Sequence, residues 1–301
     1  MDEATRTDEV VVGVDGSAGA RTALRWGLGE ARLRNRAVRL VTVRPRDERA
    51  PAHDTDVADV EQDVRARMHA EATQVAATAG CDAVPLHAEV RYGQPAQQLV
   101  DAAGPDGLLV VGSRGRGNLR GALLGSVSQQ CVQHARGPVV VAQDDESTHG
   151  AVLWREAASR VLVGVDGSPG SVAAVRFALA EARLRGGELH LVHAWLDTVS
   201  GYGGRPWAMP ATTLREEADT VLREAMRSAW SDGPPDVQVR AETIEGLDWD
   251  VLTEVAEAAD LLVVGRRGRT GWSSLLLGSV SLRCITYSPC PVAVVPAPLS
   301  R

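Results

Sequence analysis

The chain repeats itself once along its length, and this duplication constrains its fold more than any other feature. VVVGVDGS at 10–17 returns as VLVGVDGS at 161–168, an offset of 151 residues. A glycine-rich stretch at 112–127 returns at 265–280, with nine of its sixteen positions identical. Each copy has roughly the usual length of one domain, so the sequence predicts two tandem domains rather than a short-period solenoid.

The boundaries of the copies follow from where the repetition stops. The segment 143–159, QDDESTHGAVLWREAAS, has no counterpart inside the other copy. We therefore predict a first domain at 8–143, a linker at 144–158 and a second domain at 159–297.

Each copy alternates short apolar runs with segments of helical character. The predicted strands are 10–14, 38–43, 86–90, 108–112 and 139–143 in the first copy, and 161–165, 188–195, 237–242, 261–265 and 292–296 in the second. The predicted helices are 18–35, 58–80, 96–103 and 126–135, and 169–185, 214–230, 250–258 and 279–287. Strands that are apolar throughout and alternate with helices predict a parallel sheet covered on both faces.

Composition excludes several classes of function. The chain has one Phe, so its cores must consist mainly of Val, Leu and Ala. It has no lysine, which excludes both the phosphate-binding lysine of a Walker A motif and catalysis through a lysine Schiff base. A net charge of −7 without a basic block argues against a nucleic-acid partner. The polar start, MDEATRTDEV, does not resemble a signal peptide, and no apolar run is long enough for a membrane helix. We therefore expect a cytoplasmic protein without membrane association.

Metal and thiol chemistry are not expected either. The four cysteines form no CxxC pair and no zinc-finger spacing, and no HExxH motif occurs. Cys131 and Cys284 are equivalent in the two copies and fall on the last helix, where buried small hydrophobes are the better interpretation. We predict neither a catalytic residue nor a resident metal site.

The first motif that carries chemistry is GVDGS, at the end of the first strand of each copy. It places Asp15 and Asp166 where ligands bind in open α/β sheets, beyond the carboxyl ends of the strands. A carboxylate there can accept hydrogen bonds from ribose hydroxyls. The alternative is that each Asp only initiates the turn or caps the following helix.

The second motif is the segment that we call the glycine loop, between Gly112 and Gly125 in the first copy and between Gly265 and Gly278 in the second. Its spacing is G-x2-G-x9-G-S in both copies. Glycines let backbone N–H groups surround an anion, and the Gly-Ser pair then opens a helix whose N-terminus favours negative charge. We expect the serine to cap that helix and to contact phosphate; the alternative is a flexible loop with an ordinary cap.

Together these motifs resemble the ATP-binding class of the universal stress protein family, in its tandem two-domain form, over nearly the whole chain. The resemblance implies two Rossmann-like (adenine nucleotide alpha hydrolase-like) domains, each with a five-stranded parallel sheet of order 3-2-1-4-5. It implies ATP, with or without Mg²⁺, between the first and fourth strands. It also implies pairing through the last strand, hence a pseudo-dimer within the chain or a homodimer.

The resemblance assigns Asp15 and Asp166 to the ribose side and Val43 and Ala194 to the adenine side. In the first copy the ATP-binding residues would be Gly13, Asp15, Val43, Gly112, Ser113, Arg114, Gly115, Arg116, Gly125, Ser126 and Val127. In the second they would be Gly164, Asp166, Ala194, Gly265, Arg266, Arg267, Gly268, Arg269, Gly278, Ser279 and Val280. Arg266 departs from the small Ser113, which predicts a second loop that is either more crowded or more strongly anion-binding.

The function implied is that of a nucleotide-dependent regulator of the stress response, acting on an unidentified protein partner. Two alternatives remain: a slow ATPase, and an interaction module that binds no nucleotide. His193, at the place where the first copy has Thr42, is interpreted as a strand histidine with satisfied hydrogen bonds rather than as a catalytic base.

Overall fold

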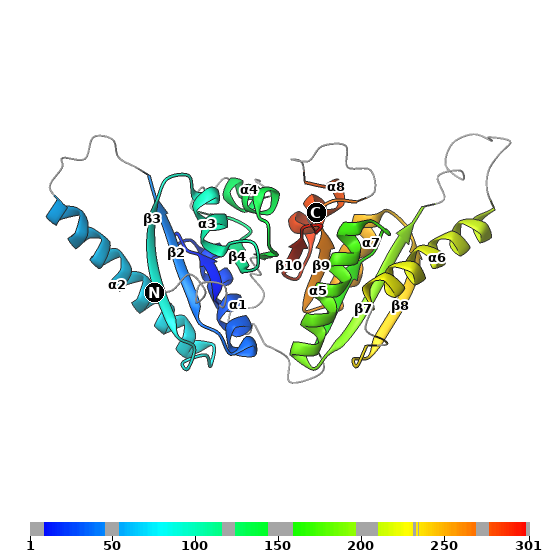
Figure 1. The fold of residues 1–301 in the computed structure, drawn as a ribbon, viewed down its shortest axis with the longest axis horizontal. Helices are drawn as coiled ribbons and strands as arrows, with labels where there is room; N and C mark the ends of the chain where they lie inside the picture. The colour runs from blue at the N-terminus through cyan, green and yellow to red at the C-terminus, as the bar shows by residue number, and fades with distance from the viewer. Residues whose placement is uncertain are drawn as a thin grey trace. The chain divides into compact units, whose positions relative to one another are not determined.

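The computed structural model describes residues 9–45, 54–115, 124–143, 159–196, 210–230, 233, 235–268 and 277–298. The chain divides into two compact units, 1–153 and 154–301. Each unit is a layer of parallel strands with helices on both faces, as the ribbon of Figure 1 shows.

In the first unit the chain alternates between strand and helix throughout. The strands are β1 (Val10–Gly13), β2 (Val38–Arg44), β3 (Leu86–Tyr92), β4 (Leu108–Gly112) and β5 (Val139–Ala142). The helices are α1 (Ala18–Arg34), α2 (Asp54–Thr78), α3 (Pro95–Ala103) and α4 (Ser126–His134). All strand pairs are parallel, in the order β3-β2-β1-β4-β5.

The second unit has the same succession of elements. Its strands are β6 (Arg160–Gly164), β7 (Glu188–Trp195), β8 (Val239–Glu245), β9 (Leu261–Gly265) and β10 (Val292–Val295). Its helices are α5 (Pro169–Arg185), α6 (Ala211–Ala229), α7 (Asp248–Val255), the 3-10 turn η2 (Ala256–Ala258) and α8 (Ser279–Tyr287). The order β8-β7-β6-β9-β10, with all pairs parallel, confirms the predicted five-stranded fold.

The helices cover opposite faces of each sheet because consecutive strand residues point to opposite sides. On β1, Val12 faces α1: a Cβ on Gly27 of that helix would lie 2.6 Å from Val12 Cγ2. The next residue, Gly13, faces α3, where its own Cβ would lie 3.1 Å from Leu99 Cδ1. Helices α1 and α2 pack on one face and α3 and α4 on the other; α5 with α6 and α7 with α8 repeat this arrangement (Figure 1).

The cores consist of strand residues that water does not reach. The runs that predicted the central strands are buried along almost their full length, as in LLVVG of β4 and β9. Because both faces of the sheet are covered, such strands have no polar side to present, which is why their sequences do not alternate.

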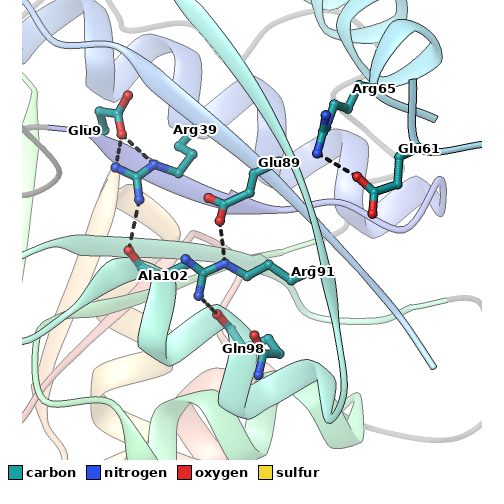
Figure 2. A network of polar contacts seen from close by, with 8 residues as sticks. All are labelled: Glu9, Arg39, Glu61, Arg65, Glu89, Arg91, Gln98 and Ala102. Atoms are coloured by element: carbon teal, nitrogen blue, oxygen red, sulfur yellow. Dashed lines mark hydrogen bonds and ion pairs between the residues drawn. The ribbon is translucent and has the colours of Figure 1, made fainter. Parts of the chain in front are cut away.

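Arginines of β2 and β3 hold α3 against the first sheet, as Figure 2 shows. The buried guanidinium of Arg39 donates to the Glu9 carboxylate and, at 3.4 Å, to the carbonyl of Ala102. Arg91 is paired with Glu89 at 2.8 Å and donates to the carbonyl of Gln98 at 3.2 Å. Such contacts fix the helix that packs beneath the end of β1, where the predicted site lies.

Candidate functional site

A pocket of about 690 Å³ lies at the carboxyl ends of β6, β7 and β9 in the second unit. Strands β6 and β9 are neighbours in the sheet but not in sequence, so the pocket is at the topological switch point, where ligands bind in open α/β sheets. The predicted residues that line it are Gly164, Asp166, Ala194, Gly265, Arg267, Gly268, Gly278, Ser279 and Val280. Its volume is within the range of small-molecule sites.

Asp166 has a structural role in its turn and also faces the pocket. Its Oδ1 accepts a hydrogen bond from the backbone N–H of Ser168 at 3.0 Å, and Asp15 does the same for Ser17 at 2.9 Å. The serines cap the helices, since the Oγ atoms of Ser17 and Ser168 each accept a backbone N–H at 3.1 Å. The alternative interpretation of the motif, turn initiation, therefore describes part of what these aspartates do, and Asp166 also lines the pocket.

The glycine loop passes so close to the aspartate that a side chain on the loop would displace the carboxylate. A Cβ on Gly268 would lie 2.5 Å from Asp166 Oδ2, and a Cβ on Gly115 would lie 3.0 Å from Asp15 Oδ2. Bare backbone therefore faces the carboxylate in both units, which is the arrangement that lets a ligand approach peptide N–H groups closely.

The loop is equally close to the helix that follows the first strand. A Cβ on Gly112 would lie 2.4 Å from the backbone of Gly19, and one on Gly265 would lie 2.8 Å from the backbone of Gly170. The end of the fourth strand of each unit therefore meets the start of the helix that follows the first strand through glycine backbone. This is the physical reason why glycine is required there in both copies.

The helices beside the loop begin at Ser126 and Ser279, as predicted, but the capping residue is the glycine before each of them. Gly125 and Gly278 are the N-caps of α4 and α8, and neither helix has a side-chain cap; the expectation that Ser126 and Ser279 cap them is wrong. Glycine brings no side-chain oxygen, so no side chain caps the N–H groups of the first turn, and helix N-termini of this kind favour anions.

Sequence reasoning missed the third residue of each of these helices, a serine whose hydroxyl binds the first residue of the glycine loop. Ser281 Oγ donates to the carbonyl of Gly265 at 2.7 Å, and Ser128 Oγ donates to that of Gly112 at 2.5 Å. Both serines are almost fully buried. The repeated run GSVS marks these serines in both copies, but it does not indicate which carbonyl each of them reaches.

The two arginines at the start of the second loop have different surroundings. Arg267 lines the pocket, whereas Arg266 does not. Burial, and secondarily the charge of Arg267, lowers the pKa of Arg266 from its ordinary value, although an arginine stays protonated at neutral pH. Of the residues predicted to bind ATP, Arg116 and Arg269 lie outside the part of the chain that the structure describes.

The pocket of the first unit is smaller, about 280 Å³, and is lined by residues that include Asp15, Thr42 and side chains of α1 and α2. Of the predicted residues, Asp15 lines it. The others that the structure describes do not line it: Gly13, Val43, Gly112, Ser113, Arg114, Gly115, Gly125, Ser126 and Val127. The contact of Gly115 with Asp15 and the 2.8 Å hydrogen bond from Gly125 N to Ser113 O nevertheless keep the loop at the same strand ends.

The cysteines of the chain lie in the interior of the two units. All four cysteines are buried and free, and burial raises the pKa of both Cys131 and Cys284 to about 12. Among the described residues, no group of three or more His, Cys, Asp or Glu side chains is placed to hold a metal ion. No helix in the same part of the chain is long and apolar enough to cross a membrane.

Comparison with known proteins places this geometry in a family. The sequence profile of the universal stress protein family matches residues 7–143 and 158–296. A universal stress protein of Mycolicibacterium smegmatis is 35% identical over 95% of this chain and 96% of its own.

A solved structure gives the same result for the fold. A universal stress protein of Archaeoglobus fulgidus aligns over 97% of both chains with a TM-score of 0.64 and 21% identity. A universal stress protein crystallised in complex with cAMP is 28% identical, covering 47% of this chain and 99% of its own, with a TM-score of 0.36. With a family profile that matches twice and a relative similar over nearly its full length, the chain belongs to the universal stress protein family and contains two of its domains in tandem.

Proposed function

We propose that this chain is an ATP-binding regulator whose conformation or assembly responds to the nucleotide. The observation that carries the proposal is the pocket of the second unit, where Asp166, Arg267 and the uncapped N-terminus of α8 converge. Such a site combines an acceptor for ribose hydroxyls with a cation and helix N–H groups for phosphates. The predicted ATP-binding residues of both copies are part of this proposal.

The described residues fit a nucleotide in a specific way. A Cβ on Gly268 would lie against the Asp166 carboxylate, so the loop leaves backbone exposed where phosphate oxygens would bind. Ala194 and the helices α6 and α7 supply apolar surface at the other end of the pocket, which suits a base. ATP when bound would supply three phosphates for the loop; a Mg²⁺ ion would come with the nucleotide, with Asp166 as the nearest proposed carboxylate.

The decisive experiment is to identify what the protein binds. The purified full-length protein is denatured and any released nucleotide identified by mass spectrometry, and ATP, AMP and cAMP are then titrated by calorimetry with and without Mg²⁺. We expect ATP to bind more tightly than cAMP. The site offers three groups that can bind phosphate, namely the glycine loop, Arg267 and the N-terminus of α8, and cAMP has only one phosphate to fill them. No bound nucleotide and no heat with ATP would overturn the proposal and favour the interaction module.

The regulator is distinguished from the slow ATPase by following phosphate release for hours at saturating ATP. We expect release no faster than that of a Gly115→Val, Gly268→Val double variant. Rapid transfer to water requires a positioned water and usually metal ions. Clear release by the wild type alone would replace the regulator with the ATPase.

The remaining expectations concern the cell and the assembly. We propose a cytoplasmic protein whose two units pair within the chain, with a protein partner in the stress response. Sedimentation velocity with and without ATP tests for a homodimer: a monomer under both conditions would restrict any pairing to the two units of one chain.

A further inference from the structure

The two units differ at the base end of their pockets. His193 on β7 lines the pocket of the second unit, and Thr42, at the same place in the duplication, lines that of the first. Both residues come one position before those assigned to the adenine side, Ala194 and Val43. The same strand end thus presents an imidazole in one unit and a hydroxyl in the other.

The hydrogen bonding of His193 defines its tautomer. Its Nδ1 lies 2.5 Å from the backbone carbonyl oxygen of Val165. Since a carbonyl oxygen can only accept, Nδ1 carries the proton and donates it. In the neutral ring the second nitrogen, Nε2, is then an acceptor without a proton. No described residue hydrogen-bonds to Nε2.

The residues that α6 contributes to this pocket have the same hydrogen-bonding polarity. Helix α6 contributes Glu217, an exposed carboxylate that also only accepts hydrogen bonds when ionised, beside the apolar Leu214 and Val221. A ligand edge that enters between β7 and α6 therefore meets acceptors, and a donor on the ligand is favoured there.

The first unit has no such fixed polarity. The hydroxyl of Thr42 can donate or accept by rotating. Helix α2 contributes Arg67 together with Glu71, and Glu71 is paired with Arg21 at 2.7 Å. This pocket therefore offers both hydrogen-bond donors and hydrogen-bond acceptors to a ligand.

We propose that His193 is a specificity-determining residue: its Nε2 accepts a hydrogen bond from the exocyclic amine of adenine and rejects bases with a carbonyl at that position. The second unit is thus the base-selective site, and the first unit discriminates less. This inference rests on the proposed function, because it requires a nucleotide in the pocket. It adds to that function one residue, His193, and a preference for adenine over bases that carry a carbonyl at the same position.

The test compares ATP with ITP, which has a carbonyl in place of the adenine amine. Calorimetry is done on the full chain with Gly115→Val, a substitution that we expect to confine binding to the second unit. We expect ATP to bind about tenfold more tightly than ITP. The amine of ATP would donate to Nε2 of His193, whereas the carbonyl of ITP would leave this acceptor unpaired. His193→Asn keeps an N–H for Val165 and removes Nε2, and it should bring the ratio close to one.

Two exchanges between the units provide matched controls. His193→Thr in the same background copies the first unit and should lose the selectivity. Thr42→Val, in a protein with Gly268→Val that leaves only the first site, should leave the ATP:ITP ratio unchanged. Circular dichroism and thermal melting confirm that each variant is folded, and the ratio of two affinities is insensitive to a small general loss of stability.

Each outcome decides something. If wild type binds ATP and His193→Asn keeps the tenfold preference, the assignment of His193 is overturned while the proposed function stands. If the Gly115→Val protein binds no ATP although wild type does, the second unit is not the site and the inference fails alone. If wild type binds neither nucleotide, the proposed function and the inference fail together.

Discussion

Asp166 Oδ2 lies 2.5 Å from the place that a Cβ on Gly268 would occupy, and the corresponding distance from Asp15 Oδ2 to Gly115 is 3.0 Å. A Cβ on either glycine would therefore crowd a carboxylate that lies about one hundred positions earlier in the sequence. The carboxylate that ends the first strand and the loop that follows the fourth strand form one wall of the pocket.

A side chain at this place should block nucleotide binding without unfolding the domain. We expect Gly115→Val together with Gly268→Val to abolish ATP binding in calorimetry, because each Cβ would push the aspartate or the loop out of position. The circular dichroism spectrum should remain that of the wild type. Each single variant should halve the stoichiometry if both units bind. Unchanged affinity in the double variant would show that the glycine loop is not the phosphate site.

Removal of the aspartate separates its two roles. Asp166→Ala should weaken ATP binding about tenfold, since an acceptor for the ligand is lost, and should destabilise the domain by about 1 kcal/mol, since Ser168 N loses its partner. Ser168→Ala is the matched control: it removes the helix cap, at a cost of about 1 kcal/mol, and leaves the carboxylate in place. Titration calorimetry and urea unfolding measure the two effects. Equal loss of affinity in both variants would assign the aspartate to turn formation alone.

The buried thiols should be inert in the folded protein. Burial raises the pKa of Cys131 and Cys284 to about 12 and that of Cys290 to about 11, so the reactive thiolate is scarce at neutral pH. We expect all four thiols to react with an aromatic disulfide reagent in denaturant, and more than about 100-fold more slowly without it. A fast thiol in the native protein would contradict its burial.

Stability should decrease on mild acidification because of His190 in β7. This residue is 2% exposed and contacts Glu242 at 2.7 Å through Nε2; its Nδ1 is buried without a partner among the described residues. Burial lowers the pKa of His190 below its ordinary value of 6.5, and the pairing with Glu242 only partly opposes this. The unfolded chain therefore takes up the proton first, so the stabilisation is complete above about pH 6.5 and is lost as the pH falls toward the folded-state pKa.

Melting temperatures between about pH 8 and about pH 5.5 test this, because histidines titrate there and most carboxylates do not. His190→Leu should flatten the decrease, whereas His69→Leu, at an exposed position of α2, should not change it. If both variants follow the wild-type curve, His190 does not control the pH dependence.

Most of the fold could be predicted from the sequence, because its signals are local and occur twice. Uninterrupted apolar strands, the intervening helices and the duplication led to two parallel α/β domains, and the order of strands confirms them. The third strand of each unit was less accurate: β3 extends to Tyr92 and β8 runs from Val239 to Glu245, against the predicted 86–90 and 237–242. Edge strands are half-exposed, and their limits are set by pairing with β2 and β7 rather than by their own pattern.

The site divides in the same way between local and tertiary information. The two aspartates, the glycine spacing and the helix after the Gly-Ser pair could be read from the chain, and their assignment to ATP stays a prediction. The hydrogen bonds of Ser128 and Ser281 could not, because a serine inside a helix gives no sign of which carbonyl it will reach.

The sequence by itself determined the two domains, their family and the glycines, because duplication, hydrophobic pattern and backbone requirements are written in consecutive residues. Only the tertiary structure decided what the two pockets are like. The sequence gives His193 and Thr42 at this strand end, but only packing brings His193 to the carbonyl of Val165 and Thr42 into a pocket shared with Arg67 of α2. The depth of each pocket and its hydrogen-bonding polarity arise from contacts between residues far apart in the chain, which no spacing in one segment encodes.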